Sequence, residues 1–158
     1  MSTKKSYISS MSHIYKRKPL EHQREALNIS WDKKYFLYLM GMGTGKTKVA
    51  IDNAVFLFNQ KEINSVFIIA PNSITHNWLT EIDADSSAKG FKYLYRRDSF
   101  DFHLKDNINW YIMNVEALSH ASGVKAAKKV IDKHGDKMLM VVDECTTIKN
   151  HKAKRTKN

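Results

Sequence analysis

The sequence predicts an α/β fold in which a parallel sheet carries helices on both faces. Five short apolar segments of strand length alternate along the 158 residues with segments whose apolar residues recur at helical spacing. This alternation is typical of parallel sheets whose strands are joined by right-handed crossovers. In addition, the apolar segment 35–40 runs into three alternate glycines, and the segment 138–142 runs into Asp-Glu. At this length we expect one domain with a substantial core.

The amino-terminal part contains a basic arm, a helix and a strand. Residues 1–17 are polar and basic without sustained periodicity, so we expect a flexible arm there and a single domain at 18–158. From Pro19 onward, Leu20, Leu27 and Trp31 approximate helical spacing, and a proline suits the first turn of a helix. The six consecutive apolar residues at 35–40 predict a strand that is buried on both faces.

The middle of the chain continues the alternation of helix and strand. Asn72 or Ser73 is expected to cap a helix that runs to about residue 83. The apolar residues of this helix recur every four positions, so we expect them to share one buried face, with Trp78 in the core. The elements predicted here are a helix from about 46 to 60, a strand at 65–70 that Pro71 ends, and a helix with Ile74, Trp78 and Ile82 on its apolar face.

The part of the chain from residue 91 onward is predicted to contain three strands. Residues 91–95 alternate in polarity and 110–113 are continuously apolar, which predicts the third and fourth strands. Gly123 is expected to precede a basic helix that ends near Gly135. The remaining predicted elements are a short helix around 116–118, the basic helix at 124–134 and the fifth strand at 138–142.

The composition bounds the partners and the compartment. With 26 Lys and Arg against 16 Asp and Glu, the net charge is +10, which favours nucleic acid as a partner, although a solvated lysine surface has the same composition. The single cysteine, Cys145, excludes an internal disulfide and is typical of a reducing compartment. No apolar run approaches the ~18–20 residues of a membrane span, and the first residues lack the apolar core of a signal peptide. We therefore expect a cytoplasmic protein without a membrane partner.

The glycines after the first predicted strand form a candidate phosphate-binding loop. Glycines let the backbone approach a polyphosphate with its N–H groups pointing inward, and the following helix adds its unpaired N–H groups and its dipole. Lys46 offers a charge to the β and γ phosphates, and the Thr47 hydroxyl is a ligand for Mg²⁺. Met40 stands where the full pattern G-x-x-x-x-G-K-[ST] has glycine. The expected nucleotide-binding residues of the loop are Gly41, Gly43, Thr44, Gly45, Lys46 and Thr47.

The acidic pair Asp143-Glu144 complements this loop. Both features follow the carboxyl ends of predicted strands, and such ends share one edge of a parallel sheet, where ligands bind. Asp143 is expected to hold Mg²⁺ through water opposite Thr47, and Glu144 to orient or deprotonate the water that attacks the γ phosphate. Alone, an acidic pair more often caps a turn, but the loop upstream favours the metal interpretation. We predict ATP and Mg²⁺ as cofactors and Lys46, Asp143 and Glu144 as catalytic residues.

Two stretches resemble the first RecA-like lobe of superfamily two helicases: Gly-Met-Gly-Thr-Gly-Lys-Thr at 41–47 and Val-Val-Asp-Glu-Cys-Thr-Thr-Ile-Lys-Asn at 141–150. In particular they resemble the Snf-type DNA translocases, whose acidic motif typically reads Asp-Glu-Ala-His followed by Leu-Lys-Asn. The resemblance spans about residues 18 to 152 and implies an ATP hydrolase of helicase or translocase type that acts on nucleic acid, in particular duplex DNA. Cys145 and Thr146 depart from Ala-His, and the histidine position is implicated in coupling hydrolysis to movement.

Three further motifs occur in the order that this family has. Residues 19–27 resemble the adenine-reading Q motif, with Gln23 as the base-contacting amide, although a glutamine here could also serve as a helix cap. Residues 70–81 and 114–118 resemble motifs that contact a nucleic-acid backbone. The nucleic-acid contacts that the resemblance implies are Pro71, Asn72, Ser73, Asn77, Asn114 and Glu116.

In this family ATP lies between two RecA-like lobes, and the second lobe supplies arginine fingers. Within residues 1–158, Arg96, Arg97 and Arg155 lack the motif context of a finger. We therefore expect a second RecA-like lobe as a partner, in cis or in trans. We also expect residues 1–158 on their own to hydrolyse ATP near the background rate.

Two other functions stay open. A nucleotide-binding module that regulates or pairs with another polypeptide would carry the same loop without turnover of its own. The third possible function is that of a P-loop kinase or small-molecule ATPase. The Q motif and the motifs after the second and fourth predicted strands argue against it.

Overall fold

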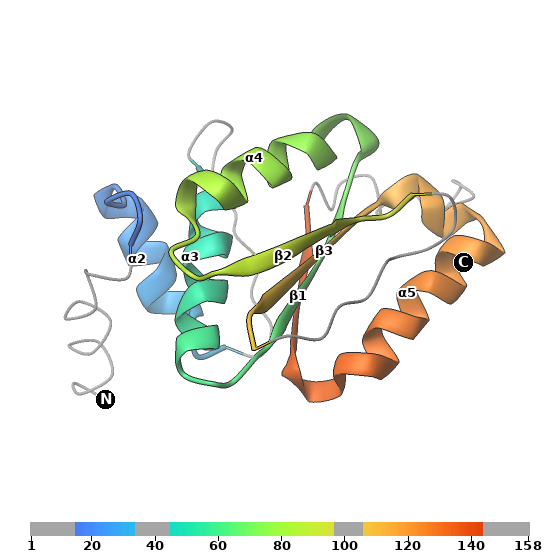
Figure 1. Ribbon diagram of the computed structural model, residues 1–158. Coiled ribbons are helices and arrows are strands. Elements are labelled where there is room, and N and C mark those ends of the chain that lie inside the picture. The colour runs from blue at the N-terminus through green and yellow to red at the C-terminus, as the bar shows by residue number, and fades with distance from the viewer. Residues whose placement is uncertain (1–14, 34–44, 97–105, 144–158) are drawn as a thin grey trace.

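The computed structural model describes residues 15–33, 45–96 and 106–143, in which helices alternate with strands (Figure 1). The helices are α2 (Glu21–Ser30), α3 (Lys46–Asn59), α4 (Thr75–Asp85) and α5 (Ala121–His134). The strands are β1 (Ser65–Ala70), β2 (Gly90–Leu94), β3 (Ile108–Asn114) and β4 (Met138–Val142). None of the helices in these ranges is long and apolar enough to cross a membrane.

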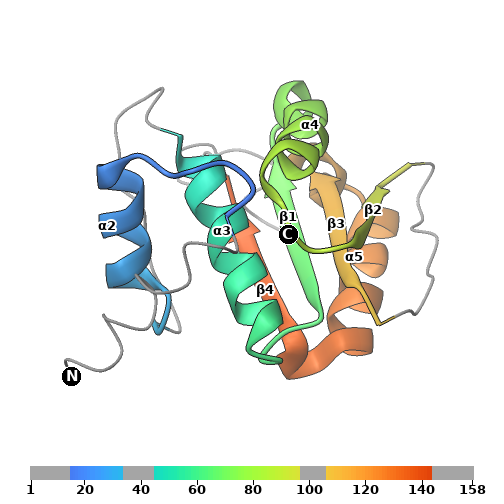
Figure 2. The same cartoon turned by 60° about the vertical axis from the view of Figure 1, so that its left-hand side comes forward.

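The described strands form one sheet in the order β2-β3-β1-β4, and every neighbouring pair is parallel (Figure 2). At the centre, Ile68 of β1 pairs with Ile112 of β3 on one side and with Val141 of β4 on the other. Parallel pairing brings the carboxyl ends of all these strands to one edge, where ligands bind in such sheets. The predicted α/β class is confirmed, and β1 and β4 have the predicted bounds.

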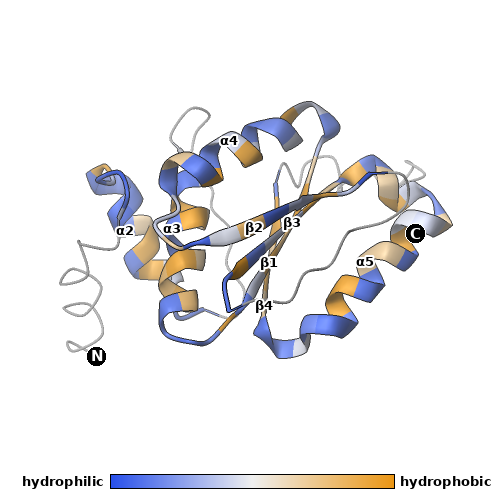
Figure 3. Ribbon diagram, viewed as in Figure 1, coloured by the Kyte–Doolittle hydropathy of each residue, from blue (hydrophilic) through white to orange (hydrophobic). Residues whose placement is uncertain are grey.

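Side chains of β1 alternate between two cores because successive residues of a strand point to opposite faces. Val66 and Ile68 pack with α3 and α4 on one face, whereas Phe67 and Ile69 pack with α5 on the other. All six residues of β1 are buried, as expected for a strand covered on both faces. Figure 3 shows the resulting pattern, with apolar residues concentrated on the strands and alternating with polar ones along the helices.

Helix α2 forms an outer layer on α3. Leu27 of α2 packs against Val49 and Phe56 of α3, and the ring of Trp31 meets that of Phe56 edge-on with centroids 5.2 Å apart. The predicted apolar face of α2 is wrong at one end, because Leu20 precedes the helix and is exposed while Gln23 is buried. Helix α2 therefore directs the side-chain amide of Gln23 toward the start of α3.

Helix α4 begins later than predicted. Neither Asn72 nor Ser73 caps it, because a short 3₁₀ helix occupies Asn72–Ile74. In this turn the backbone N–H of Ile74 donates a hydrogen bond to the Pro71 carbonyl at 3.0 Å. The hydroxyl of Thr75 then donates back to the Asn72 carbonyl at 3.0 Å. The predicted burial of Trp78 is confirmed.

Helix α5 begins at Ala121, so the prediction that Gly123 precedes it is wrong. A β-carbon at Gly123 would overlap the carbonyl oxygen of Ala117 in the preceding 3₁₀ helix, Val115–Ser119. Glycine here permits the close approach of two backbones and does not mark a helix boundary.

Several predicted features fall outside the described residues. They are the strand at 35–40, residues 1–14 of the basic arm, and the site residues Gly41, Gly43, Thr44 and Glu144.

Candidate functional site

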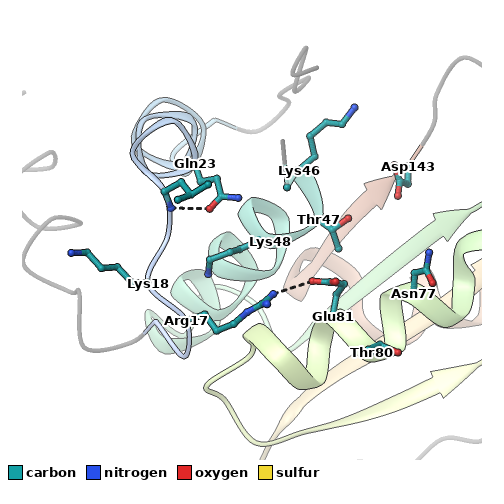
Figure 4. A pocket seen from close by; sticks show the side chains of 12 residues that line it. Arg17, Lys18, Gln23, Lys46, Thr47, Lys48, Asn77, Thr80, Glu81 and Asp143 are labelled. Atoms are coloured by element: carbon teal, nitrogen blue, oxygen red, sulfur yellow. Dashed lines mark hydrogen bonds and ion pairs between the residues drawn. The ribbon is translucent and has the colours of Figure 1, made fainter. Parts of the chain in front are cut away.

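A cavity of about 650 Å³ lies at the carboxyl edge of the sheet, between α2, the start of α3, α4 and the end of β4 (Figure 4). Its walls bring together residues that the sequence places far apart. Helix α4 contributes Asn77, Thr80 and Glu81, and the segment before α2 contributes basic residues, including Arg17 and Lys18. The predicted nucleotide and metal residues on the wall are Gln23, Gly45, Lys46, Thr47 and Asp143.

Gln23 and Gly45 lie against each other at one end of this cavity. Gly45 has φ 78°, in the left-handed region that favours glycine, and a β-carbon at this position would overlap Nε2 of Gln23. The oxygen of the Gln23 amide caps the start of α2, since Oε1 accepts a hydrogen bond from the Leu20 backbone N–H at 2.9 Å. The capping alternative for Gln23 is thus present in the structure together with its place on the cavity wall.

The first turn of α3 supplies the next part of the wall. Gly45 is the residue before the helix, and within the described part of the chain no side chain caps this end. The first N–H groups of a helix have no partner within it and carry the positive end of its dipole, so this end attracts anions. Lys46 and Thr47 belong to this turn, which adds an ammonium group and a hydroxyl to the same region.

Asp143 lies across the cavity from α3, directly after β4. Its backbone N–H continues the β1–β4 pairing by donating to the Ile69 carbonyl at 2.8 Å. Its side-chain oxygen Oδ2 accepts a hydrogen bond from the indole Nε1 of Trp78 at 3.0 Å. The carboxylate is therefore oriented by a core residue of α4.

A cluster of charged residues, most of them buried, lies at the cavity wall and behind it. The Lys48 ammonium is 2.9 Å from Asp52 on the same helix and 3.4 Å from Asp85 of α4, and Asp85 also pairs with Arg17 at 2.7 Å. Burial raises the pKa of Asp52 to about 6, and Lys48 limits that rise. Burial also tends to raise the pKa of Asp85, but the hydrogen bond from Arg17 and the charge of Lys48 outweigh it and the pKa is lowered.

A second cavity, of about 200 Å³, lies farther along the same edge of the sheet. Its walls include Tyr95, Asn114, Glu116 and His120. The Glu116 carboxylate accepts a hydrogen bond from the Asn72 backbone N–H at 3.2 Å. The two segments predicted to contact a nucleic-acid backbone, which follow β1 and β3, therefore touch each other.

In a comparison with protein families, residues 16–157 match the family described as type III restriction enzyme, res subunit (ResIII). The chain belongs to the ResIII family. ResIII domains are helicase-like ATPase domains of superfamily two with a RecA-like P-loop fold, so the predicted fold is confirmed and the resemblance is confirmed at the level of the superfamily. No curated protein matches the chain.

The cavity of this ResIII domain fits a magnesium nucleotide chemically. Mg²⁺ prefers oxygen ligands and accepts few carboxylates, and the cavity offers the Thr47 hydroxyl with the Asp143 carboxylate. Lys46 and the start of α3 suit the phosphates, and Gln23 offers an amide for a base. Asn77, predicted to contact nucleic acid, lines this cavity and not the second one.

Three residues of the ResIII domain have contacts that the sequence analysis missed. The sequence pattern predicts a core position for Trp78 and a flexible arm for Arg17, and it predicts no role for Lys48. The four-residue spacing of Lys48 and Asp52 on a predicted helix was an available sign of an ion pair. No local pattern pairs Trp78 with Asp143 or Arg17 with Asp85, because each pair is formed by the packing of separate elements.

Proposed function

We propose that this domain is the ATP-binding lobe of a nucleic-acid-dependent ATPase of the Snf type, one that translocates on duplex DNA. The observation that carries the nucleotide part is the single cavity that collects Gln23, Lys46, Thr47 and Asp143 from three separate parts of the fold. The Snf-type part rests on the acidic motif and its Ile-Lys-Asn continuation at 148–150.

Each cavity residue has a distinct task in the proposed complex. Lys46 and the first N–H groups of α3 bind the phosphates, while Thr47 and Asp143 hold Mg²⁺, the latter through water. When bound, Mg²⁺ neutralises charge that develops on the transferred phosphoryl group. Gln23 reads the adenine, and Asn77 contacts the nucleotide or its water from the α4 side. Glu144, the next residue after Asp143, orients the attacking water.

The proposed nucleic-acid surface follows β1 and β3. Pro71, Asn72, Ser73 and Asn114 present backbone and amide groups there, and the net charge of +10 attracts phosphates. Glu116 carries the same sign of charge as a phosphate, so in this proposal it positions the Asn72 backbone and does not contact the nucleic acid itself.

The nucleotide part is tested by Lys46→Ala. Charge-assisted hydrogen bonds contribute about 1.5–3 kcal/mol each, so we expect affinity for ATP-Mg to fall roughly 10- to 100-fold. Isothermal titration calorimetry measures this, with Lys125→Ala, an exposed lysine of α5, as the matched control. Equal affinity in Lys46→Ala and in the control would reject the phosphate-binding loop.

Phosphate release distinguishes the proposed ATPase lobe from a module that has no turnover. We expect residues 1–158 alone to stay near background with or without duplex DNA, because an arginine finger contributes roughly 10³–10⁵ in rate and no arginine of this segment has its motif context. Supplying a second RecA-like lobe should restore turnover stimulated by duplex DNA, and Glu144→Gln should abolish it. If turnover stays absent with a second lobe, the nucleotide-binding module without turnover is favoured. If only RNA stimulates turnover, translocation on duplex DNA is rejected.

A further inference from the structure

Trp78 is buried, with 3% of its surface exposed, yet its polar atom is directed at the functional site. The residue belongs to the core between α4 and the sheet, together with Ile82, Ile68 and Ile112. Its indole N–H donates to Oδ2 of Asp143 at 3.0 Å. The Trp78 ring is enclosed by apolar neighbours, which fix its position.

A tryptophan is well suited to hold a carboxylate in one orientation. Its N–H can only donate, and a buried indole N–H ordinarily requires an acceptor. The ring is rigid and packed, so the position of the donor is set by the core. Hydrogen bonds to an ionised acceptor are about twice as strong as neutral ones.

Asp143 is thus fixed at two points. Its backbone N–H is bonded to Ile69 of β1, and its carboxylate oxygen Oδ2 is bonded to Trp78 of α4. A carboxylate has two oxygens with about four lone-pair sites, so the bond from the indole leaves capacity for a metal-bound water. The side chain of Asp143 still reaches the cavity that Thr47 and Lys46 line.

We propose that Trp78 is a positioning residue for Mg²⁺: its indole N–H holds the Asp143 carboxylate in the orientation that binds the hydrated ion. This inference rests on the proposed nucleotide function of the cavity. Groups that orient metal ligands typically account for about 10–100-fold in metal affinity. Because Asp143 is proposed to act through water, we expect an effect of about tenfold.

The test compares Trp78→Phe with Trp110→Phe. Phenylalanine keeps an aromatic ring in the core and removes the N–H, and Trp110 is an equally buried core tryptophan on β3 that does not line the cavity. Calorimetry gives the affinity for ADP with and without Mg²⁺, and the ratio of the two is the gain that the ion provides. We expect Trp78→Phe to reduce this gain about tenfold and to leave Mg²⁺-free affinity within about twofold, whereas Trp110→Phe preserves both.

A second readout needs no nucleotide. The chain has three tryptophans, so three indole N–H signals are expected by NMR, and Trp78→Phe identifies the one that belongs to residue 78. Asp143→Asn should shift that signal upfield, because an amide is a weaker acceptor than a carboxylate, and Mg²⁺-ADP should perturb it in the wild type.

The outcomes separate this inference from the proposed function. If the wild-type chain binds no nucleotide, the proposed function fails and the inference fails with it. The inference alone is overturned if Trp78→Phe leaves the Mg²⁺-dependent gain in ADP affinity unchanged, or if it lowers the affinity for ADP equally with and without Mg²⁺. Either result leaves Trp78 with a structural role only. The inference is also overturned if the Trp78 indole N–H signal does not shift in Asp143→Asn.

Discussion

Gly45 shows how a single residue joins two parts of the candidate site. Its left-handed backbone turns the chain into α3, and its missing side chain leaves room for the amide of Gln23. Either requirement alone would favour glycine, and any other residue here would also force the side-chain amide of Gln23 to shift. Gln23, which is proposed to read the adenine, therefore lies directly against Gly45 of the proposed phosphate-binding loop.

We predict that Gly45→Ala weakens ATP-Mg binding and lowers the free energy of unfolding by about 1–3 kcal/mol, the usual cost of backbone strain. The control is Gly135→Ala, which also has a positive φ, 54°, although its ψ of −128° differs from the 39° of Gly45, and among the described residues it has no atom within 4 Å of the added β-carbon. Urea denaturation should show a loss of stability in both variants, because both glycines have a positive φ, whereas calorimetry should show a loss of ATP-Mg affinity only in Gly45→Ala. Full ATP-Mg affinity in Gly45→Ala would contradict the role given to this contact.

At the level of secondary-structure elements, His134 ties the end of α5 to the sheet. One ring nitrogen, Nδ1, is 3.0 Å from the side-chain oxygen of Asn64, and the other, Nε2, is 2.8 Å from the Tyr111 hydroxyl. The amide oxygen can only accept, so Nδ1 carries the proton and Nε2 accepts from Tyr111. Burial raises the pKa of Tyr111 to about 12, which keeps its hydroxyl a donor. The network is therefore complete with a neutral histidine.

This arrangement predicts acid destabilisation. Burial, with a smaller contribution from the charge of Lys133, lowers the pKa of His134 below its ordinary value of 6.5. As the pH falls below about 6.5, the unfolded chain binds a proton at this residue more readily than the folded chain, so the stability contributed by neutral His134 is lost. We expect the urea midpoint of the wild type to fall between pH 7 and pH 5, and to fall less in His134→Gln. Comparing the wild type with His134→Gln cancels the titration of other groups. An equal pH dependence of the urea midpoint in both proteins would count against His134 as the source of the acid destabilisation.

At the scale of the whole molecule, ion pairs to a buried carboxylate connect three separate segments. Lys48 of α3 and Arg17 of the segment before α2 converge on Asp85 of α4, which is fully buried. The ring of Tyr15 lies near the same ammonium, with its centroid 5.7 Å from Nζ of Lys48. The last residues of the predicted basic arm are thus attached to the domain beside the cavity.

We predict that Lys48→Ala lowers the free energy of unfolding by about 3–5 kcal/mol, because it leaves the carboxylates of Asp52 and Asp85 buried with less compensating charge. Lys46→Ala, two residues away on the cavity wall, should change stability by less than about 0.5 kcal/mol, as is usual for positions without such partners. Urea denaturation at pH 8 measures both. A loss below about 1 kcal/mol at Lys48 would mean that the ion pairs contribute little.

Much of the fold could be read from local patterns. The apolar runs at 65–70 and 138–142 gave the bounds of β1 and β4. For β1 the reason is that a strand buried on both faces cannot contain many polar residues without cost. The order of glycine loop, Lys46-Thr47 and Asp143 along alternating strands and helices was enough to predict a shared site. These signals are visible in the sequence because each depends on neighbours a few residues apart.

Other features depend on how the elements pack together. The start of α4, the place of Gly123 within α5 and the buried side of Gln23 follow from contacts between segments, and the sequence pattern was wrong or silent on each. The same holds for the bond from Trp78 to Asp143 and the pairing of Arg17 with Asp85, which span 65 and 68 residues. A hydrogen bond or ion pair between distant residues has no local periodicity, so it becomes apparent only when the sheet and its helices bring the two side chains within reach.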